Sequence, residues 1–271
     1  MSRPGPGTVA TRAPRSAARG PARPASPFRM ALALAAYELR LAVRRGESLL
    51  ITFVIPAGVL LVFSAFDMGG TGATGEPVDR LLPGSISLAI IAASLVALAI
   101  ATGFERQYGV IKRLGGSPAG SGVVVAAKTA AVVVVEAAQL VLLVGLAAVV
   151  LGWAPGPGAS PPLVLAALVL GTIAFAGLGL LMAGTLRADV TLALANLLFL
   201  VSLVLGGVVV PLDRLPGVVA SVAEVLPPAA LTYALAVGLG TAAGDATEAV
   251  VLLAGWGAVL AVLAARRFHW D

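Results

Sequence analysis

The chain contains little charge and no cysteine. Asp, Glu, Lys and Arg together make up 11% of its 271 residues, whereas hydrophobic residues make up 59%. A soluble globular domain carries about 25% charged residues, so this chain has too few charged side chains to cover a surface that faces water. The lack of cysteine excludes disulfide bonds and thiol chemistry. The composition therefore predicts an all-α integral membrane protein, because helices satisfy their backbone polar groups within lipid.

Histidine and phosphate-binding motifs are also scarce or missing. The single histidine, His269, lies at the C-terminus, and an intramembrane hydrolase or metal site needs histidine within a span. The chain has no G-x-x-x-x-G-K-[ST] loop, so it has no ATPase site of this kind. The basic residues flank apolar segments instead of forming one patch with interleaved aromatics, which argues against nucleic-acid binding. We expect no catalytic residue, no metal site and no cofactor bound by this chain.

Six apolar segments are long enough to cross a bilayer, which takes about 20 helical residues. They are residues 49–66, 81–103, 130–151, 163–186, 190–210 and 249–265. The first is the shortest and contains Pro56, which removes one backbone hydrogen bond and favours a kink. We expect one six-span domain over residues 28–271, with both termini on the same side.

The N-terminal region differs from the spans in composition. Residues 1–27 are rich in Pro, Ala, Gly and Arg and contain almost no large apolar side chain, which predicts a disordered tail. Residues 28–47 predict an amphipathic helix at the membrane surface, with Leu32, Leu39 and Val43 on one side.

Arginine and lysine are distributed unevenly among the loops. If the N-terminus is cytoplasmic, only Arg80 and Arg214 of the 18 basic residues lie outside. The opposite orientation would violate the positive-inside rule. The sequence therefore predicts that both termini, and the loop between the second and third spans, are cytoplasmic.

That loop contains the polar run FERQYGVIKRLGGSP, from Phe104 to Pro118. At 100° per residue one arc of it holds apolar side chains, namely Phe104, Tyr108, Val110, Ile111 and Leu114. The opposite arc holds the charged side chains Glu105, Arg106, Lys112 and Arg113. This separation predicts one short amphipathic helix, ended by Gly115 and Gly116. Its length and mixed charge favour docking on another protein, and a plain stop-transfer charge cluster is the alternative.

Two stretches resemble ABC transporter permeases of the type 2 exporter superfamily. The first, ERQYGVIKRLGGSP, resembles their cytoplasmic coupling segment through Glu105, Arg106, Tyr108, Gly109, Lys112, Arg113, Leu114, Gly115 and Pro118. The second begins in the fifth span and matches at Asn196, Gly206, Gly207, Pro211, Leu215, Pro216, Leu226 and Pro227. One departure follows Pro228, where such permeases often carry an arginine and this chain has the uncharged run TYALAVGLG.

The resemblance implies a permease subunit of an ATP-driven exporter in the bacterial cytoplasmic membrane. It implies a separate ABC ATPase subunit that binds ATP and Mg, and a second permease subunit, either an identical copy or a sister chain. It assigns the ATPase-coupling interface to Glu105, Arg106, Tyr108, Gly109, Lys112, Arg113 and Leu114. It also implies that residues 215–240 form a pair of short re-entrant helices between the fifth and sixth spans.

Glu136 and Gln139 are polar residues inside the third span. A charge deep in lipid costs at least ~2.5–3.5 kcal/mol on insertion scales, so Glu136 must face protein, water or a partner, or carry a proton. Glu136 either lines a polar pathway or makes a structural bond to another helix, through water to Lys128 or to Asn196. We expect the structural role, and we expect Asn196 and Ser202 to bond between helices. An ion-coupled secondary transporter that uses Glu136 is the alternative function. For Trp153 we expect a place in an interfacial aromatic belt.

Overall fold

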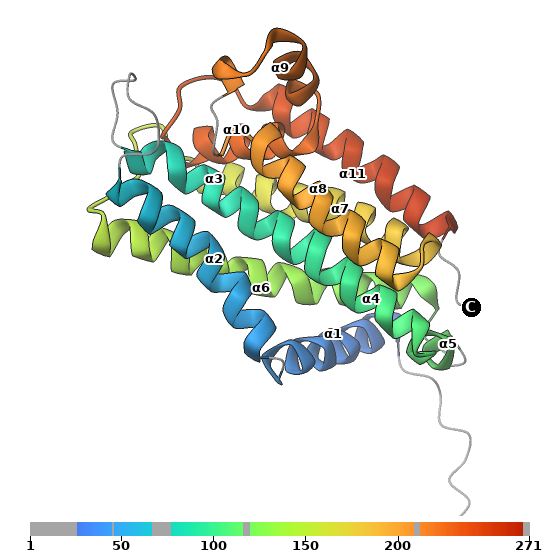
Figure 1. Cartoon of the computed structure of the whole chain (residues 1–271). Coiled ribbons are helices and arrows are strands. Elements are labelled where there is room, and N and C mark those ends of the chain that lie inside the picture. The colour runs from blue at the N-terminus through green and yellow to red at the C-terminus, as the bar shows by residue number, and fades with distance from the viewer. Residues whose placement is uncertain (1–25, 45, 67–76, 116–119, 209–211, 268–271) are drawn as a thin grey trace, which may run out of the picture.

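The computed structural model describes residues 26–44, 46–66, 77–115, 120–208 and 212–267. Across these ranges the chain forms helices and connecting turns, and the long helices pack side by side in one bundle (Figure 1). The predicted disordered tail falls almost entirely on residues 1–25, which lie outside the described ranges.

The first half of the bundle runs from α1 to α6. Its elements are α1 (Pro27–Arg44), α2 (Gly46–Ala65), α3 (Pro77–Ile91), the π-helical segment η1 (Ala92–Ala97), α4 (Leu98–Gln107), α5 (Val110–Gly115) and α6 (Ser121–Val150). The second half contains α7 (Pro161–Thr185), α8 (Ala188–Leu205), the short turn η2 (Leu212–Arg214), α9 (Gly217–Glu224), α10 (Pro227–Leu239) and α11 (Thr247–Arg267).

Within the described ranges, five helices are long and apolar enough to cross a membrane. They are Pro77–Gln107, Gly122–Val150, Pro161–Thr185, Ala188–Leu205 and Thr247–Arg267. The helix α2 has 20 residues, with Pro56 inside it, and at 1.5 Å per residue it is about 30 Å long. These helices agree with an all-α membrane protein, and the count of six spans stays a prediction.

Two helices begin earlier in the chain than the sequence predicted. The helix that contains residues 81–103 runs over 31 residues, from Pro77 to Gln107, and α6 begins at Ser121 instead of residue 130. In both helices the additional turns include charged residues that bind other groups of the protein, as described below. Lys128 therefore lies inside a helix, whereas the sequence placed it in a loop.

The segment between α8 and α11 forms the two short helices that were predicted there. The helices α9 and α10 meet at a bend of 73°. Pro227 and Pro228 occupy the first turn of α10, directly after the N-cap Leu226. Proline is well tolerated there, because the first-turn N–H groups have no partner within the helix.

The helix α7 lies at the centre of the bundle and packs closely through glycines. A Cβ atom on Gly177 would lie 3.0 Å from the backbone nitrogen of Ala261 in α11. A Cβ atom on Gly179 would lie 3.0 Å from the carbonyl oxygen of Leu95 in η1. These glycines therefore let α11 and η1 pack directly against the backbone of α7.

Trp153 does not lie in an interfacial belt. Its side chain is only 6% exposed, and its indole N–H donates to Oδ1 of Asp79 at 3.0 Å. This bond joins the end of α6 to the start of α3. The indole can be buried because Asp79 satisfies its single donor.

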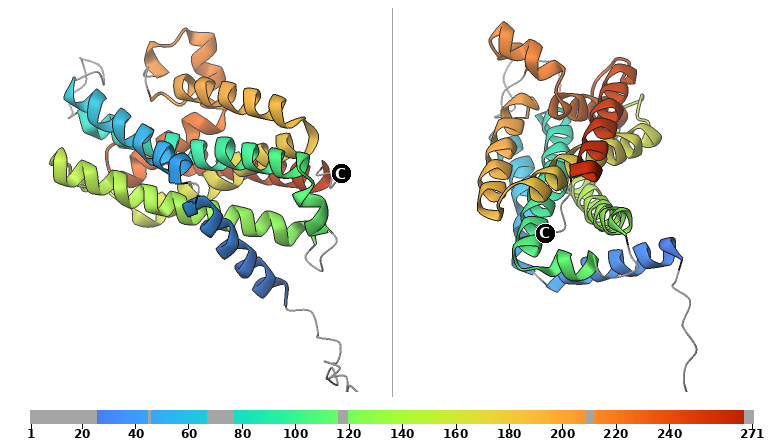
Figure 2. Two further views of the ribbon diagram at one scale, coloured as in Figure 1. Left: turned by 60° about the horizontal axis from the view of Figure 1, so that its bottom comes forward. Right: turned by 90° about the vertical axis from the view of Figure 1, so that its right-hand side faces the viewer.

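The helices α1 and α5 lie at the same end of the bundle, across the long helices (Figures 1 and 2). We call this end, where α4 and α7 also finish, the α5 end. The structure confirms a helix at α1. Leu32 and Val43 are exposed, as a shared side predicts, whereas Leu39 is partly buried, like Leu34 and Leu41. Its placement on a membrane surface stays a prediction.

Candidate functional site

The run from Phe104 to Leu114 does not form the single helix that the sequence predicted. The helix α4 ends at Gln107, and Gly109 adopts a positive φ of 70° before α5 begins at Val110. The backbone N–H of Gly109 donates to the carbonyl of Arg106 at 3.0 Å, which closes the turn. Glycine adopts this left-handed conformation without steric cost, so α4 ends at a glycine in the manner common to helix C-termini.

The turn changes which side chains face outward. In α5, Ile111 is fully buried while Lys112 and Arg113 are exposed, as the helical pattern predicted. Tyr108 and Val110 were predicted on the buried side, yet Tyr108 is 72% exposed and Val110 is 42% exposed. The α5 end therefore presents a mixed surface of two apolar and two basic side chains. We call Tyr108, Val110, Lys112 and Arg113 the α5 surface.

Arg106 points into the bundle and away from this surface. Its guanidinium group donates to the backbone carbonyls of Ala183, at 2.8 Å, and Leu186, at 3.0 Å. The last carbonyls of a helix lack partners within it, and a cation there is favoured by the helix dipole. Arg106 thus caps the end of α7 and fixes the end of α4 against it.

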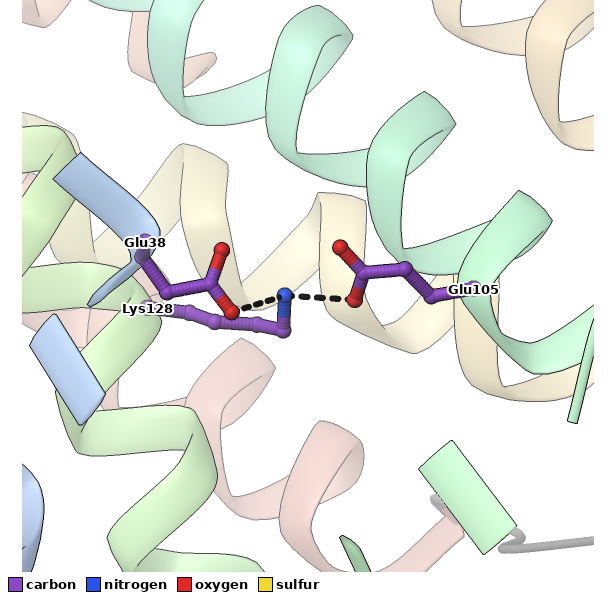
Figure 3. Close-up of polar contacts among 3 residues, drawn as sticks. All are labelled: Glu38, Glu105 and Lys128. Carbon is purple, nitrogen blue, oxygen red and sulfur yellow. Dashed lines mark hydrogen bonds and ion pairs between the residues drawn. The ribbon is translucent and has the colours of Figure 1, made fainter. Parts of the chain in front are cut away.

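Glu105 also points inward, where it shares a lysine with another helix. The ammonium nitrogen Nζ of Lys128 lies 2.7 Å from Oε2 of Glu105 and 2.8 Å from Oε1 of Glu38 (Figure 3). The Lys128 side chain is 2% exposed, and those of Glu105 and Glu38 are 13% and 17% exposed. We call these three residues the Lys128 triad. It joins α1, α4 and α6.

Sequence reasoning missed the Lys128 triad because its members lie far apart in the chain. Glu38 and Lys128 are 90 positions apart, and Glu105 and Lys128 are 23 apart. The available signal was the presence of Glu38 and Glu105 in regions where the other charges are mostly basic. The pattern could not reveal that one lysine would bind both.

Glu136 is 1% exposed and contacts α7. The hydroxyl group of Thr172 lies in hydrogen-bond contact with Oε2 of Glu136, so α6 and α7 meet at a polar pair inside the bundle. The expected partners were wrong. Lys128 instead binds Glu38 and Glu105, and Asn196 is exposed on the outer side of α8. Oε1 of Glu136 has no hydrogen-bond partner within the described ranges.

Gln139, one turn further along α6, is also buried. Its side-chain amide nitrogen donates to the backbone carbonyl of Thr52 in α2 at 3.0 Å. Proline at position 56 cannot donate to that carbonyl, because its nitrogen carries no hydrogen. The two polar residues of α6 therefore hold α7 and α2 respectively.

Within the described ranges, the side chains of Asn196 and Ser202 bond inside α8 and not to other helices, contrary to expectation. Asn196 is exposed on α8, and its amide nitrogen donates to the carbonyl of Leu192 at 3.0 Å in the same helix. Ser202 donates to the carbonyl of Leu198 at 2.7 Å. The Asn196 side chain is left facing outward from a long apolar helix.

One comparison with known proteins found a family that the chain matches. A family model described as ABC-2 type transporter matches residues 30–239. This range begins in α1, contains the α5 surface and ends with α10. No curated protein matches the chain.

Proposed function

Because the chain belongs to the ABC-2 type transporter family, we propose that it is the permease subunit of an ATP-driven exporter that couples to a separate nucleotide-binding subunit. The family domain is the membrane-spanning part of an ABC transporter and is not itself an ATPase. Beyond the family, we propose export as the direction of transport, the α5 surface as the docking site and a second permease subunit. We also propose a bacterial cytoplasmic membrane, with α9 and α10 re-entering it.

The observation that carries the docking proposal is the exposed helix α5 on a firmly held base. Ile111 anchors α5 in the bundle, while Lys112 and Arg113 project outward. Just before α5, Arg106 fixes the end of α4 to α7. When a partner displaces α5, the displacement therefore passes directly into the long helix Pro77–Gln107. A flexible loop would absorb the same displacement.

The α5 surface combines two kinds of contact. Its basic side chains give orientation and partner choice to an encounter more than affinity. Tyr108 and Val110 supply apolar area that can hold a partner rigidly. Glu105 and Arg106, which the sequence assigned to the interface, act instead as the base beneath it.

The distribution of basic residues supports a cytoplasmic α5 end. Besides Lys112 and Arg113, this end carries basic residues from α1, from the connection after α7 and from the end of α11. These are Arg29, Arg40, Arg44, Arg187, Arg266 and Arg267. The positive-inside rule then assigns the end to the cytoplasm. A bacterial cytoplasmic membrane is the location we propose, with α9 and α10 re-entering it from the outer side.

Asn196 supports a second permease subunit. A polar amide on the lipid-facing side of a membrane helix is unfavourable, and interhelical hydrogen bonds are its usual solution. Leu200, one turn away on the same side, is 57% exposed. We propose that this face of α8 meets a second copy or a sister permease.

The alternative is a secondary transporter that uses Glu136. The unpartnered Oε1 of Glu136 favours it. Against it stands the position of Glu136, which is closed off inside one subunit between α6 and α7. Transporters of that class generally use broken helices around a midplane site.

Co-purification tests the proposal. The chain is co-expressed in turn with each ABC ATPase encoded in the same genome, with a tag on the ATPase. We expect the wild-type chain to co-purify, and the pair Lys112→Glu and Arg113→Glu to lose the ATPase. The matched control is Arg266→Glu with Arg267→Glu, which reverses two exposed charges at the same end.

Two results would contradict the proposal. One is a wild-type chain that never binds the ATPase. The other is ATP-independent uptake of ethidium by vesicles that contain the chain alone, abolished by Glu136→Gln. The second result would establish the secondary transporter instead.

A further inference from the structure

We propose that Lys128 is a positioning residue for energy coupling, which ties α1 to the end of α4 so that α1 moves together with α5. This inference rests on the proposed function, because it concerns how a displacement of α5 spreads through the permease. It adds a second route for that displacement. Besides entering α4 directly, the motion reaches α1 and then α2 through the Lys128 triad.

The first support is the shallow packing of α1, which lies along α6 and is only partly buried there. No residue of α1 is buried, and Phe28, Leu32 and Val43 are all more than half exposed. Partly buried apolar side chains contribute less than fully buried ones, so the buried ion pair strengthens the contact of α1 with α6. The bond from Glu38 to Lys128 is the specific polar contact by which the described part of α1 is held to the bundle (Figure 3).

The second support is the electrostatics of the Lys128 triad. One ammonium group lies between two carboxylates, at 2.8 Å and 2.7 Å, and is 2% exposed. Removing one partner of a buried ion pair leaves an uncompensated charge and is strongly unfavourable. Glu38 and Glu105 would also repel each other if Lys128 withdrew. Both arms of the triad are therefore stable only when α1 and α4 lie close to α6 together.

The third support is the position of the triad in the chain. Glu105 lies in the last turn of α4, three residues before Tyr108, where the turn into α5 begins. At the other arm, α1 ends at Arg44 and α2 begins at Gly46. A shift of α5 must either carry α1 with it or separate a buried ion pair. Carrying α1 along is the less costly outcome. Because α2 follows α1 directly in the chain, the shift of α1 also moves the start of α2.

Spin labels can measure this motion, because the chain has no native cysteine. One label is placed on α1 by Tyr37→Cys, one at the end of α4 by Gln107→Cys, and a reference on α9 by Val218→Cys. All three parent residues are exposed. Distances from the reference to each of the other labels are measured by pulsed electron paramagnetic resonance. The sample is the complex with the ATPase in lipid nanodiscs, first without nucleotide and then with ATP and vanadate.

We expect both distances to change on trapping in the otherwise wild-type complex. In Glu38→Gln the α4 distance should still change, while the equilibrium for the α1 shift should fall by roughly 2- to 30-fold, the range found for residues that carry coupling. Lys128→Arg keeps the charge and can bind both carboxylates, so it should restore the α1 shift that Lys128→Met loses. Glu248→Gln, an exposed glutamate at the start of α11, is the matched control and should change neither distance.

The α1 shift surviving in Glu38→Gln would overturn the inference. If Lys128→Met does not fold, Glu38→Gln decides the question, because it leaves a neutral pair of Lys128 and Glu105. If the wild-type chain never binds the ATPase, the proposed function fails, and the chain alone still tests the triad. The distance between labels from Tyr37→Cys and Gln107→Cys should then be narrowly distributed and should broaden in Glu38→Gln. An unchanged distribution would exclude the triad as the link.

Discussion

The guanidinium group of Arg106 donates to the backbone carbonyl of Ala183 at 2.8 Å, and so joins the ends of α4 and α7. The neighbouring residue, Glu105, binds Lys128 on the other side of α4. Two adjacent charged residues therefore fix the end of one helix to α7 and α6. Because α5 follows immediately, the rigidity of its base comes from these bonds.

Arg106→Lys should lower the stability of the protein. Lysine keeps the charge but loses the planar fork that reaches two carbonyls at once. A hydrogen bond to a charged group contributes about 1.5–3 kcal/mol, and we expect a loss of that size in the free energy of unfolding. Thermal unfolding in detergent would show a lower midpoint. Arg113→Lys, at an exposed position, is the control, and equal midpoints for both variants would contradict the capping role.

Gly179→Ala should destabilise the contact between α7 and η1. The added Cβ would lie 3.0 Å from the carbonyl oxygen of Leu95 and 3.1 Å from that of Ser94. Overpacking a tight contact costs typically about 1–3 kcal/mol. Gly145→Ala is the matched control, because a Cβ there meets nothing within 4 Å. Thermal unfolding of both variants checks this prediction. A midpoint for Gly179→Ala at or above that of the wild type would contradict it, because it would mean that η1 moves aside at little cost in free energy.

Thr172→Val should destabilise the protein while Thr172→Ser should not. The valine has the same shape but removes the hydroxyl that contacts Glu136. Leaving a buried polar group without its partner costs about 1–3 kcal/mol. We expect a lower midpoint for valine alone, with ATPase co-purification retained in both variants. Unchanged stability in Thr172→Val would mean that Glu136 finds another partner, and would strengthen its candidacy as a pathway residue.

Single cysteines on α8 should crosslink two copies of the chain if the permease is a homodimer. In an interface with two-fold symmetry, a residue near the axis meets its own counterpart. We expect Leu200→Cys to form a disulfide-linked dimer in membranes on oxidation, seen by non-reducing electrophoresis. Val251→Cys, on α11 at a parent residue 64% exposed, should remain monomeric. Crosslinking of a sister permease instead of a second copy would indicate a heterodimer, and no crosslink at any exposed position of α8 would reject this face.

Much of the helical architecture could be predicted from apolar length, because hydrocarbon thickness fixes how many apolar residues a helix needs. Helix ends were predicted less well. The pattern around Phe104 fits one helix, yet Gly109 at φ 70° divides it. A glycine is compatible with both a helix and a turn. Whether the helix continues through Gly109 or ends there therefore depends on what the flanking side chains bind. Here Glu105 and Arg106 bind on one side of the break, and Ile111 is buried on the other.

Which side chains of the candidate site are exposed was predicted only in part. Lys112 and Arg113 are exposed as the helical pattern required, whereas Glu105 and Arg106 belong to the interior. Charged residues usually face water because burial costs them their hydration. A sequence cannot show that Lys128 and the carbonyls at the end of α7 replace that hydration.

The sequence by itself determined that this protein is a bundle of apolar helices with a basic, short-helix segment between two of them, since composition and span length follow from the solvent alone. It also carried the residues by which the ABC-2 type transporter family is recognised. Only the tertiary structure decided which charges are available to a partner and which hold the bundle together. The reason is that an ion pair such as Glu38 with Lys128 depends on the packing of helices 90 positions apart in the chain, and no local pattern encodes that distance.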